Sequence, residues 1–254
     1  MHKKLFFSIA LAYCAAVPFQ AASQVSTGSD VVAADDKGSV AVHPIDHATL
    51  ALELGDQVVL VDPTSHRSRF SAPNLVLITD IHGDHLDTAY LKRLDLSRAR
   101  IIAPKAVSDL LPAELKNITT VLANGASIDL KGIGIEAVPM YNMPDPNDPR
   151  HPKGRGNGYV VTLGKERIYI SGDTEDIPEM RALKNIDIAF VCMNLPYTMT
   201  VQQAASGVLA FKPKVVYPYH YRGTEGLSDV ALFKKLVNEG DPNIEVKQEN
   251  WYKE

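Results

Sequence analysis

The sequence predicts an α/β fold built from two similar halves, each a mixed β-sheet with helices on one side. Two observations predict this class. Hairpin-type runs of β-forming residues are twice followed by alternating strand and helix patterns along the chain. The 254 residues, with 45% hydrophobic content, can also fill a substantial core. No fixed-period repeat or linker divides residues 38–254, so we expect one domain over that range.

The first half begins with short strands, and Gly55-Asp56 marks a hairpin turn between two of them. A buried strand then leads into strand–helix alternation. We expect strands at 39–42, 49–54, 57–61, 74–79 and 101–102, and helices at 88–96 and 105–111.

The second half repeats this order. Thr200 and Gln203 have the spacing of a capping box and predict the start of a helix. We expect strands at 119–122, 133–140, 158–163, 167–170, 186–192, 215–218 and 244–246, and helices at 200–211 and 229–238.

The first 23 residues have the pattern of a secretory signal peptide. Two lysines precede an apolar run at 5–17, and small residues follow at 21–23. An uncleaved anchor is the alternative, but the run is short for a membrane span. We therefore expect a signal peptide at 1–23, a flexible leader at 24–37, and an exported protein, periplasmic or secreted, without a stable membrane anchor.

Charge and cysteine content limit the classes of partner that the sequence predicts. Loss of Lys3 and Lys4 with the signal peptide would change the formal charge from −4 to −6, which disfavours nucleic acid as a partner. Only Cys192 would then remain, within an apolar strand pattern that predicts a buried, inert thiol. A small-molecule substrate is the expected partner.

The turn after the predicted strand 74–79 carries four ligand-type side chains within six residues: Asp80, His82, Asp84 and His85. A divalent metal ion would supply the positive charge that such a group lacks. Imidazole with carboxylate suits zinc, iron or manganese, and the absence of thiolates argues against a structural zinc site. Gly83 is expected to permit a tight turn. A polar loop with solvated histidines is the alternative.

This stretch resembles the H-x-H-x-D-H signature of the metallo-β-lactamase superfamily, and further segments are similar in the family's order. They are "VVLVDP", "HPKGRGNGYVV", "RIYISGDTE" and "VVYPYHYRG". The segments "VPMYN", "IPEM" and "PYTMT" resemble a branch related to the L-ascorbate phosphate lactonase. The resemblance implies an αββα sandwich, with two mixed sheets face to face, helices on both outer faces and a metal site at the rim.

The resemblance also implies a set of seven metal ligands for two divalent ions, with zinc expected and manganese or iron as alternatives. In it, His82 and His151 bind the first ion, with Asp80 where the family has histidine; Asp84, His85 and His220 bind the second; and Asp173 bridges both. The aspartate departs from the family pattern. Because a carboxylate is harder than imidazole, it favours manganese or iron and leaves open whether the first site is filled.

The expected activity is metal-dependent hydrolysis, in which a metal-bound hydroxide cleaves an ester, lactone, phosphodiester or amide-type bond. Asp84 is the expected catalytic residue, orienting the water and carrying its proton. A di-iron-type oxidoreductase and a non-catalytic binding protein with a degenerate first site are the alternatives.

Other polar residues are weaker candidates. His43 and His47 are interpreted as core residues or as groups that orient a ligand. Tyr141 and Tyr197 are expected near the rim, where a tyrosine can donate to an oxyanion, although simple packing is commoner. The long loop 142–157 is basic, which indicates either attraction of an anionic substrate or ordinary solvated charge.

Overall fold

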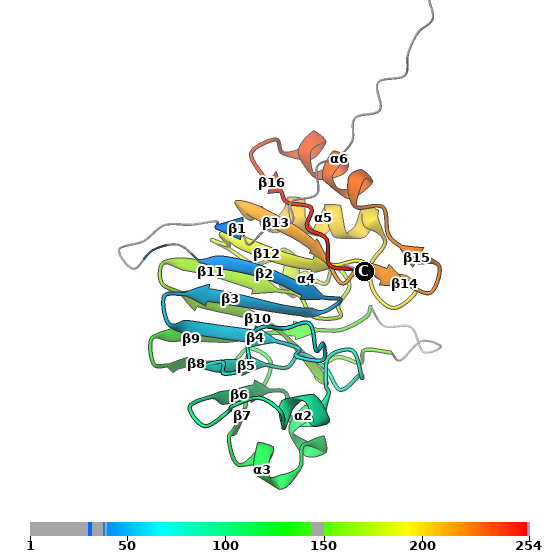
Figure 1. Ribbon diagram of the computed structural model, residues 1–254. Helices are drawn as coiled ribbons and strands as arrows, with labels where there is room; N and C mark the ends of the chain where they lie inside the picture. The colour runs from blue at the N-terminus through cyan, green and yellow to red at the C-terminus, as the bar shows by residue number, and fades with distance from the viewer. Residues whose placement is uncertain (1–29, 32–37, 39, 144–149, 253–254) are drawn as a thin grey trace, which may run out of the picture.

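Two β-sheets lie face to face, with helices outside them, in the computed structural model, which describes residues 30–31, 38, 40–143 and 150–252 (Figure 1). Within this part of the chain each sheet has seven strands. The first sheet follows chain order from β1 to β7, and the second has the order β16-β13-β12-β11-β10-β9-β8. Buried apolar side chains from both sheets form the main core between them.

The first sheet is antiparallel from β1 to β4 and parallel from β4 to β7. Two of its parallel strands, β5 and β6, are almost wholly buried, as expected for strands covered on both faces. The strands are β1 (Asp30–Val31), β2 (Ala41–Asp46), β3 (Thr49–Leu54), β4 (Gln57–Val61), β5 (Leu75–Leu77), β6 (Arg100–Ala103) and β7 (Thr119–Val121).

The second sheet has the same plan, antiparallel from β8 to β11 and then parallel. Its strands are β8 (Ser127–Leu130), β9 (Ile133–Met140), β10 (Gly156–Leu163), β11 (Glu166–Ile170), β12 (Ile188–Cys192), β13 (Val215–Tyr219) and β16 (Glu245–Val246). A small hairpin, β14 (Arg222–Gly223) and β15 (Gly226–Leu227), follows β13.

Helices cover the outer face of each sheet. Leu91, Val107 and Leu115 of three short helices pack on Val76 and Ile101 of the first sheet. The second sheet is covered by three further helices, the longer two lying beside β13 and β16 (Figure 1). The helices are α1 (Thr88–Leu91), α2 (Lys105–Leu110), α3 (Ala113–Lys116), α4 (Pro178–Arg181), α5 (Val201–Phe211) and α6 (Val230–Gly240). The predicted αββα sandwich is therefore confirmed.

Most predicted elements are present, and the differences have local causes. Thr200 and Gln203 form the predicted capping box at the start of α5. The helix predicted at 88–96 ends at Leu91, and beyond it the amide of Asp95 donates to the carbonyl of Ser71 in place of a helical bond. The short elements α3, α4, β8, β14 and β15 were not predicted.

The expected signal peptide 1–23 lies outside the described residues, as does most of the leader 24–37. Of the leader, Asp30–Val31 forms β1, which pairs with β2. The helices that the structure describes include none that is both long and apolar enough to span a membrane.

Hydrogen bonds across the sandwich fix the rim where β5 ends and β10 begins. The amide of Asn157 donates to the carbonyl of Thr79 at 2.9 Å. The buried hydroxyl of Tyr159 donates to the carbonyl of Ile78 at 2.8 Å. These hydrogen bonds therefore fix the two sheets relative to each other next to the segment that carries Asp80.

We predict that Tyr159→Phe lowers the free energy of unfolding by about 1–2 kcal/mol, because it leaves a buried carbonyl without this donor. Tyr169→Phe is the matched control, since the Tyr169 hydroxyl is equally buried but makes no hydrogen bond to any described residue. Urea unfolding of both variants measures the difference. Equal stabilities would show that the cross-sheet bond contributes nothing.

Candidate metal centre

The predicted ligands meet at one edge of the sandwich, where the parallel strands of both sheets end. Carboxyl ends of parallel strands lie at a common edge, which is the usual ligand site of such sheets. All seven predicted residues reach this edge: Asp80, His82, Asp84 and His85 after β5, His151 before β10, Asp173 after β11 and His220 after β13.

One group of donors surrounds a point near His85. The Nε2 atoms of His85 and His220 are 3.2 Å apart. His85 Nε2 lies 3.4 Å from Asp173 Oδ2, and His220 Nε2 lies 3.4 Å from Asp84 Oδ2. Four donors at bond lengths of about 2.0–2.1 Å from a tetrahedral ion would lie about 3.3 Å from one another. The spacing of these atoms therefore fits a divalent ion.

The orientation of His85 is set by Asp62, the aspartate at the end of "VVLVDP". Asp62 Oδ2 accepts a hydrogen bond from His85 Nδ1 at 2.8 Å and another from the Thr79 hydroxyl at 2.7 Å. Its Oδ1 accepts the Thr79 amide at 2.8 Å. With Nδ1 acting as the donor, the lone pair of Nε2 faces the other ligands.

A second group of donors lies beside the first. His82 Nδ1 is 2.9 Å from Asp80 Oδ2, and His151 Nε2 is 3.9 Å from the same oxygen. His151 Nε2 is also 3.2 Å from Asp173 Oδ2. Asp173 therefore contributes to both groups, as a bridging ligand would.

His151 is held in the same way as His85. Its Nδ1 and its backbone amide both donate to Asn142 Oδ1, at 2.8 and 3.0 Å. The Nε2 lone pair is thereby directed at carboxylate oxygens, which also carry lone pairs. Within the part of the chain that the structure describes, His151 Nε2 and Asp173 Oδ1 are buried and make no hydrogen bond. Such unpartnered acceptors are unfavourable unless a cation lies between them.

The pKa shifts of Asp173 and His85 also indicate that this cluster favours positive charge among its carboxylates. Burial opposes ionisation of Asp173, but the charges of His220 and His85 outweigh it and hold its pKa well below the usual value. Burial would lower the pKa of His85, yet the carboxylates of Asp173 and Asp62 raise it well above the usual value. Without a metal ion, protons neutralise this cluster.

Asp80 has a partner that the sequence did not indicate. Arg155 donates to both of its carboxylate oxygens, from Nε at 3.1 Å and from Nη2 at 2.9 Å. Gly83 is not needed for a special turn, because its φ is not in the left-handed region and an added Cβ would meet no atom.

His47 belongs to the site, although the sequence indicated only a core or orienting role. Its Nε2 is 3.4 Å from Asp84 Oδ2, and its ring lies 3.9 Å from that of His220. Its Nδ1 is 2.9 Å from the Tyr252 hydroxyl, near the end of the chain. A lone histidine between two strands gives no sequence signal of contacts so distant along the chain.

Three residues of the centre have left-handed backbone conformations that non-glycine residues rarely adopt: His47 (φ 51°), Asp62 (φ 42°) and His220 (φ 47°). Strain of this kind persists where the surroundings over-determine a conformation, and it concentrates at functional sites. The fold therefore imposes these positions.

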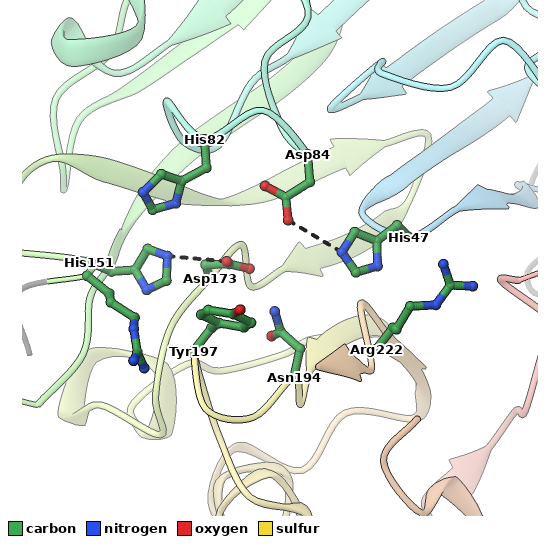
Figure 2. Close-up of a pocket in the computed structure, with 9 residues that line it drawn as sticks. His47, His82, Asp84, His151, Asp173, Asn194, Tyr197 and Arg222 are labelled. Atoms are coloured by element: carbon green, nitrogen blue, oxygen red, sulfur yellow. Dashed lines mark ion pairs between the residues drawn. The ribbon is translucent and has the colours of Figure 1, made fainter. Parts of the chain in front are cut away.

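A pocket of about 400 Å³ opens onto both groups of donors. Figure 2 shows His82 and Asp84 on one side of it, Tyr197 and Asn194 on the opposite side, and Asp173 between them. Its lining residues are His47, His82, Asp84, Arg150, His151, Asp173, Asn194, Tyr197 and Arg222.

The remaining predicted rim residues divide between the pocket and its supports. Tyr197 lines the pocket, whereas the Tyr141 hydroxyl donates to Glu179. In the basic loop Arg150 lines the pocket, and Lys153 pairs with Glu179. Cys192 is fully buried, and burial raises the pKa of its thiol to about 11, as expected for an inert thiol.

Comparison with known proteins agrees with this geometry. Residues 41–220 match the beta-lactamase superfamily domain. A UPF0173 metal-dependent hydrolase of Pyrococcus abyssi is 30% identical over 79% of this chain and 93% of its own. A crystal structure described as a metal-dependent hydrolase, from Parabacteroides distasonis, is 37% identical, with a TM-score of 0.77 over 87% of this chain and 98% of that one.

A more distant structure shares the fold alone. CmlA, a diiron β-hydroxylase from Streptomyces venezuelae, is 16% identical, with a TM-score of 0.62 over 83% of this chain and 52% of that one. The family match, the close relatives and the metal-ligand clusters agree. The chain belongs to the β-lactamase superfamily and is one of its metal-dependent hydrolases.

Proposed function

We propose that this protein binds two divalent metal ions and hydrolyses an ester, lactone, phosphodiester or amide-type bond in a small anionic substrate. Asp80, His82 and His151 would hold the first ion, and Asp84, His85 and His220 the second, with Asp173 shared between them. Zinc is the proposed metal, and manganese or iron would suit the carboxylate-rich set as well.

One observation carries the proposal. Imidazole lone pairs of His85 and His151, fixed by hydrogen bonds to Asp62 and Asn142, face the carboxylate of Asp173 at 3.4 and 3.2 Å. A divalent cation among these atoms makes the arrangement favourable, and the site opens onto a pocket large enough for a small molecule.

Ions in such a site would lower the pKa of a bound water and polarise the bond to be cleaved. The Asp84 side chain is 40% exposed at the pocket wall, so its carboxylate can accept a hydrogen bond from the attacking water. His47 Nε2 lies beside the same carboxylate and can pass a proton toward the leaving group. The hydrogen bond to Tyr252 holds the His47 ring in place.

Charge favours an anionic substrate. Two divalent ions would offset the carboxylates of Asp84 and Asp173, and Arg155 balances the carboxylate of Asp80. Arg150 and Arg222 also line the pocket, although the whole chain has a formal charge of −4. The Arg222 guanidinium lies 3.9 Å from the centre of the Tyr252 ring, which holds it at the border of the pocket.

We also propose export, because residues 1–23 have the charge and hydropathy pattern of a signal peptide. The di-iron-type oxidoreductase stays an alternative, since the similarity to CmlA concerns the fold alone. Because iron would suit either function, the substrate screen separates them, and hydrolysis that a chelator abolishes supports the hydrolase.

Asp173→Ala should lower the metal content of the purified protein at both positions and abolish hydrolysis, because both groups of donors lose a shared ligand. Metal per chain is measured by mass spectrometry. Asp176→Asn is the control, since Asp176 pairs with Arg181 outside the pocket. Unchanged metal content in Asp173→Ala would contradict the bridging role.

The substrate class is tested with lactones, esters, phosphodiesters and β-lactams, each with and without a carboxylate or phosphate group. We expect hydrolysis that a chelator abolishes and added metal restores. For the anionic members, Arg222→Gln should raise KM by about 10-fold with little change in kcat, since it removes a binding interaction alone.

Arg181→Gln serves as the control, because Arg181 is bound to Asp176 and Ser206 away from the pocket. Equal rates for neutral and anionic members of each pair, unaffected by Arg222→Gln, would contradict the anionic substrate class. Chelator-insensitive activity would contradict the hydrolytic proposal itself.

A further inference from the structure

The residue that departs from the family motif, Asp80, is completely buried and lies against a single cation. Arg155 approaches it with two parallel N–H groups, Nε to Oδ1 at 3.1 Å and Nη2 to Oδ2 at 2.9 Å. The side chain of Asp80 is 0% exposed and that of Arg155 is 18% exposed. A bidentate pair with so little water around it is among the stronger charge-assisted contacts.

The backbone holds this pair in place. Asn157, two residues after Arg155, donates its amide to the carbonyl of Thr79, the residue before Asp80. Between them, a Cβ on Gly156 would lie 3.0 Å from that carbonyl and 2.2 Å from Cε of Met140. Glycine suits this close approach, and the start of β10 places Arg155 within reach of Asp80.

Asp80 also faces the metal ligands. Its Oδ2 lies 2.9 Å from His82 Nδ1 and 3.9 Å from His151 Nε2. The Nη2 atom of Arg155 contacts the same oxygen and lies 3.4 Å from His82 Nε2. A carboxylate oxygen has two lone pairs and can accept a hydrogen bond while it binds a metal ion. The geometry therefore leaves a ligand position on Oδ2 in spite of the arginine.

The formal charges explain the pairing. A carboxylate in place of a neutral imidazole adds one negative charge to the first site, and the Arg155 guanidinium, which does not deprotonate, cancels it. We propose that Asp80 and Arg155 together replace the family's histidine as one electrically neutral ligand unit. Asp80 binds the first metal ion, and Arg155 is the positioning residue that orients Asp80 and balances its charge.

If Asp80 and Arg155 act as one unit, replacing either of them alone should disrupt the first metal site. Asp80→His restores the commoner ligand but leaves a nearly buried guanidinium without its partner, next to an imidazole and a divalent cation. Arg155→Met leaves a buried carboxylate with neither its two donors nor its counter-charge. The double variant Asp80→His/Arg155→Met removes both problems, because a neutral histidine needs no arginine.

The test is a double-mutant cycle in the full-length protein, with metal per chain and thermal unfolding as the measurements. We expect about two ions in the wild type, about one in each single variant, and about two again in the double variant. Arg167→Met is the control, because Arg167 pairs with Glu136 on the second sheet, and it should keep two ions.

Should Arg155→Met fail to fold, Arg155→Lys gives a second measurement. Lysine keeps the charge but not the planar pair of donors, so affinity at the first site should fall by about 10–100-fold while the second site is unchanged. Chelator titration of zinc from both proteins measures this difference, and equal affinities would overturn the positioning role.

This inference rests on the proposed pair of ions, and the cycle distinguishes the two failures without any substrate. No bound ion in the wild type would refute the proposed metal centre. Two ions in Asp80→His alone, or one in the double variant, would refute the Asp80–Arg155 unit and leave the centre standing. If the wild type binds one ion and Arg155→Met binds two, the guanidinium occupies the position of the first ion. That result would also refute the Asp80–Arg155 unit.

Discussion

The centre of this protein depends on a buried group of lone pairs that face one another. His85 and His151 each donate from Nδ1 to a fixed oxygen, so in the neutral imidazole their Nε2 atoms accept, and both lie close to the Asp173 carboxylate. Buried acceptors of this kind are unfavourable without a cation. These acceptors are held in place by Asp62 and Asn142, by Thr79, which donates to Asp62, and by the left-handed backbone at His220.

The two sheets supply different parts of the centre, which is why their mutual register matters. The first sheet carries the motif from Asp80 to His85, and the second carries Asp173 and His220. Their separation is set near the site by Tyr159 and Asn157, which donate across the sandwich to the end of β5. The same bonds bring Arg155 to Asp80. Fold stability and the geometry of the site are therefore linked through a few buried hydrogen bonds.

Much of this could be predicted from the sequence. Local sequence patterns correctly predicted the two halves, the order of strands and helices, and the capping box at Thr200. The seven candidate ligands follow from motif order, and the structure brings all of them together, including His151 from an irregular loop. Short elements such as α3 and β8 were missed, because a few residues carry too little periodicity.

What sequence patterns could not supply were contacts between distant segments. His47 meets Asp84 and Tyr252, and Arg155 meets Asp80 across 75 positions, without any local motif to mark them. Nothing in the sequence indicated that the three cations of the basic loop differ in role. In the structure Arg150 lines the pocket, Lys153 pairs with Glu179, and Arg155 pairs with Asp80. Only tertiary structure separates such roles.

The most direct test of the central claim is a crystal structure of the metal-loaded protein with anomalous scattering measured at the absorption edge of the bound metal. We expect two peaks about 3.5–4 Å apart. One should lie among Asp84, His85 and His220, the other among Asp80, His82 and His151, and Asp173 should contact both. A crystal soaked in metal that shows no peak among these residues would contradict the account.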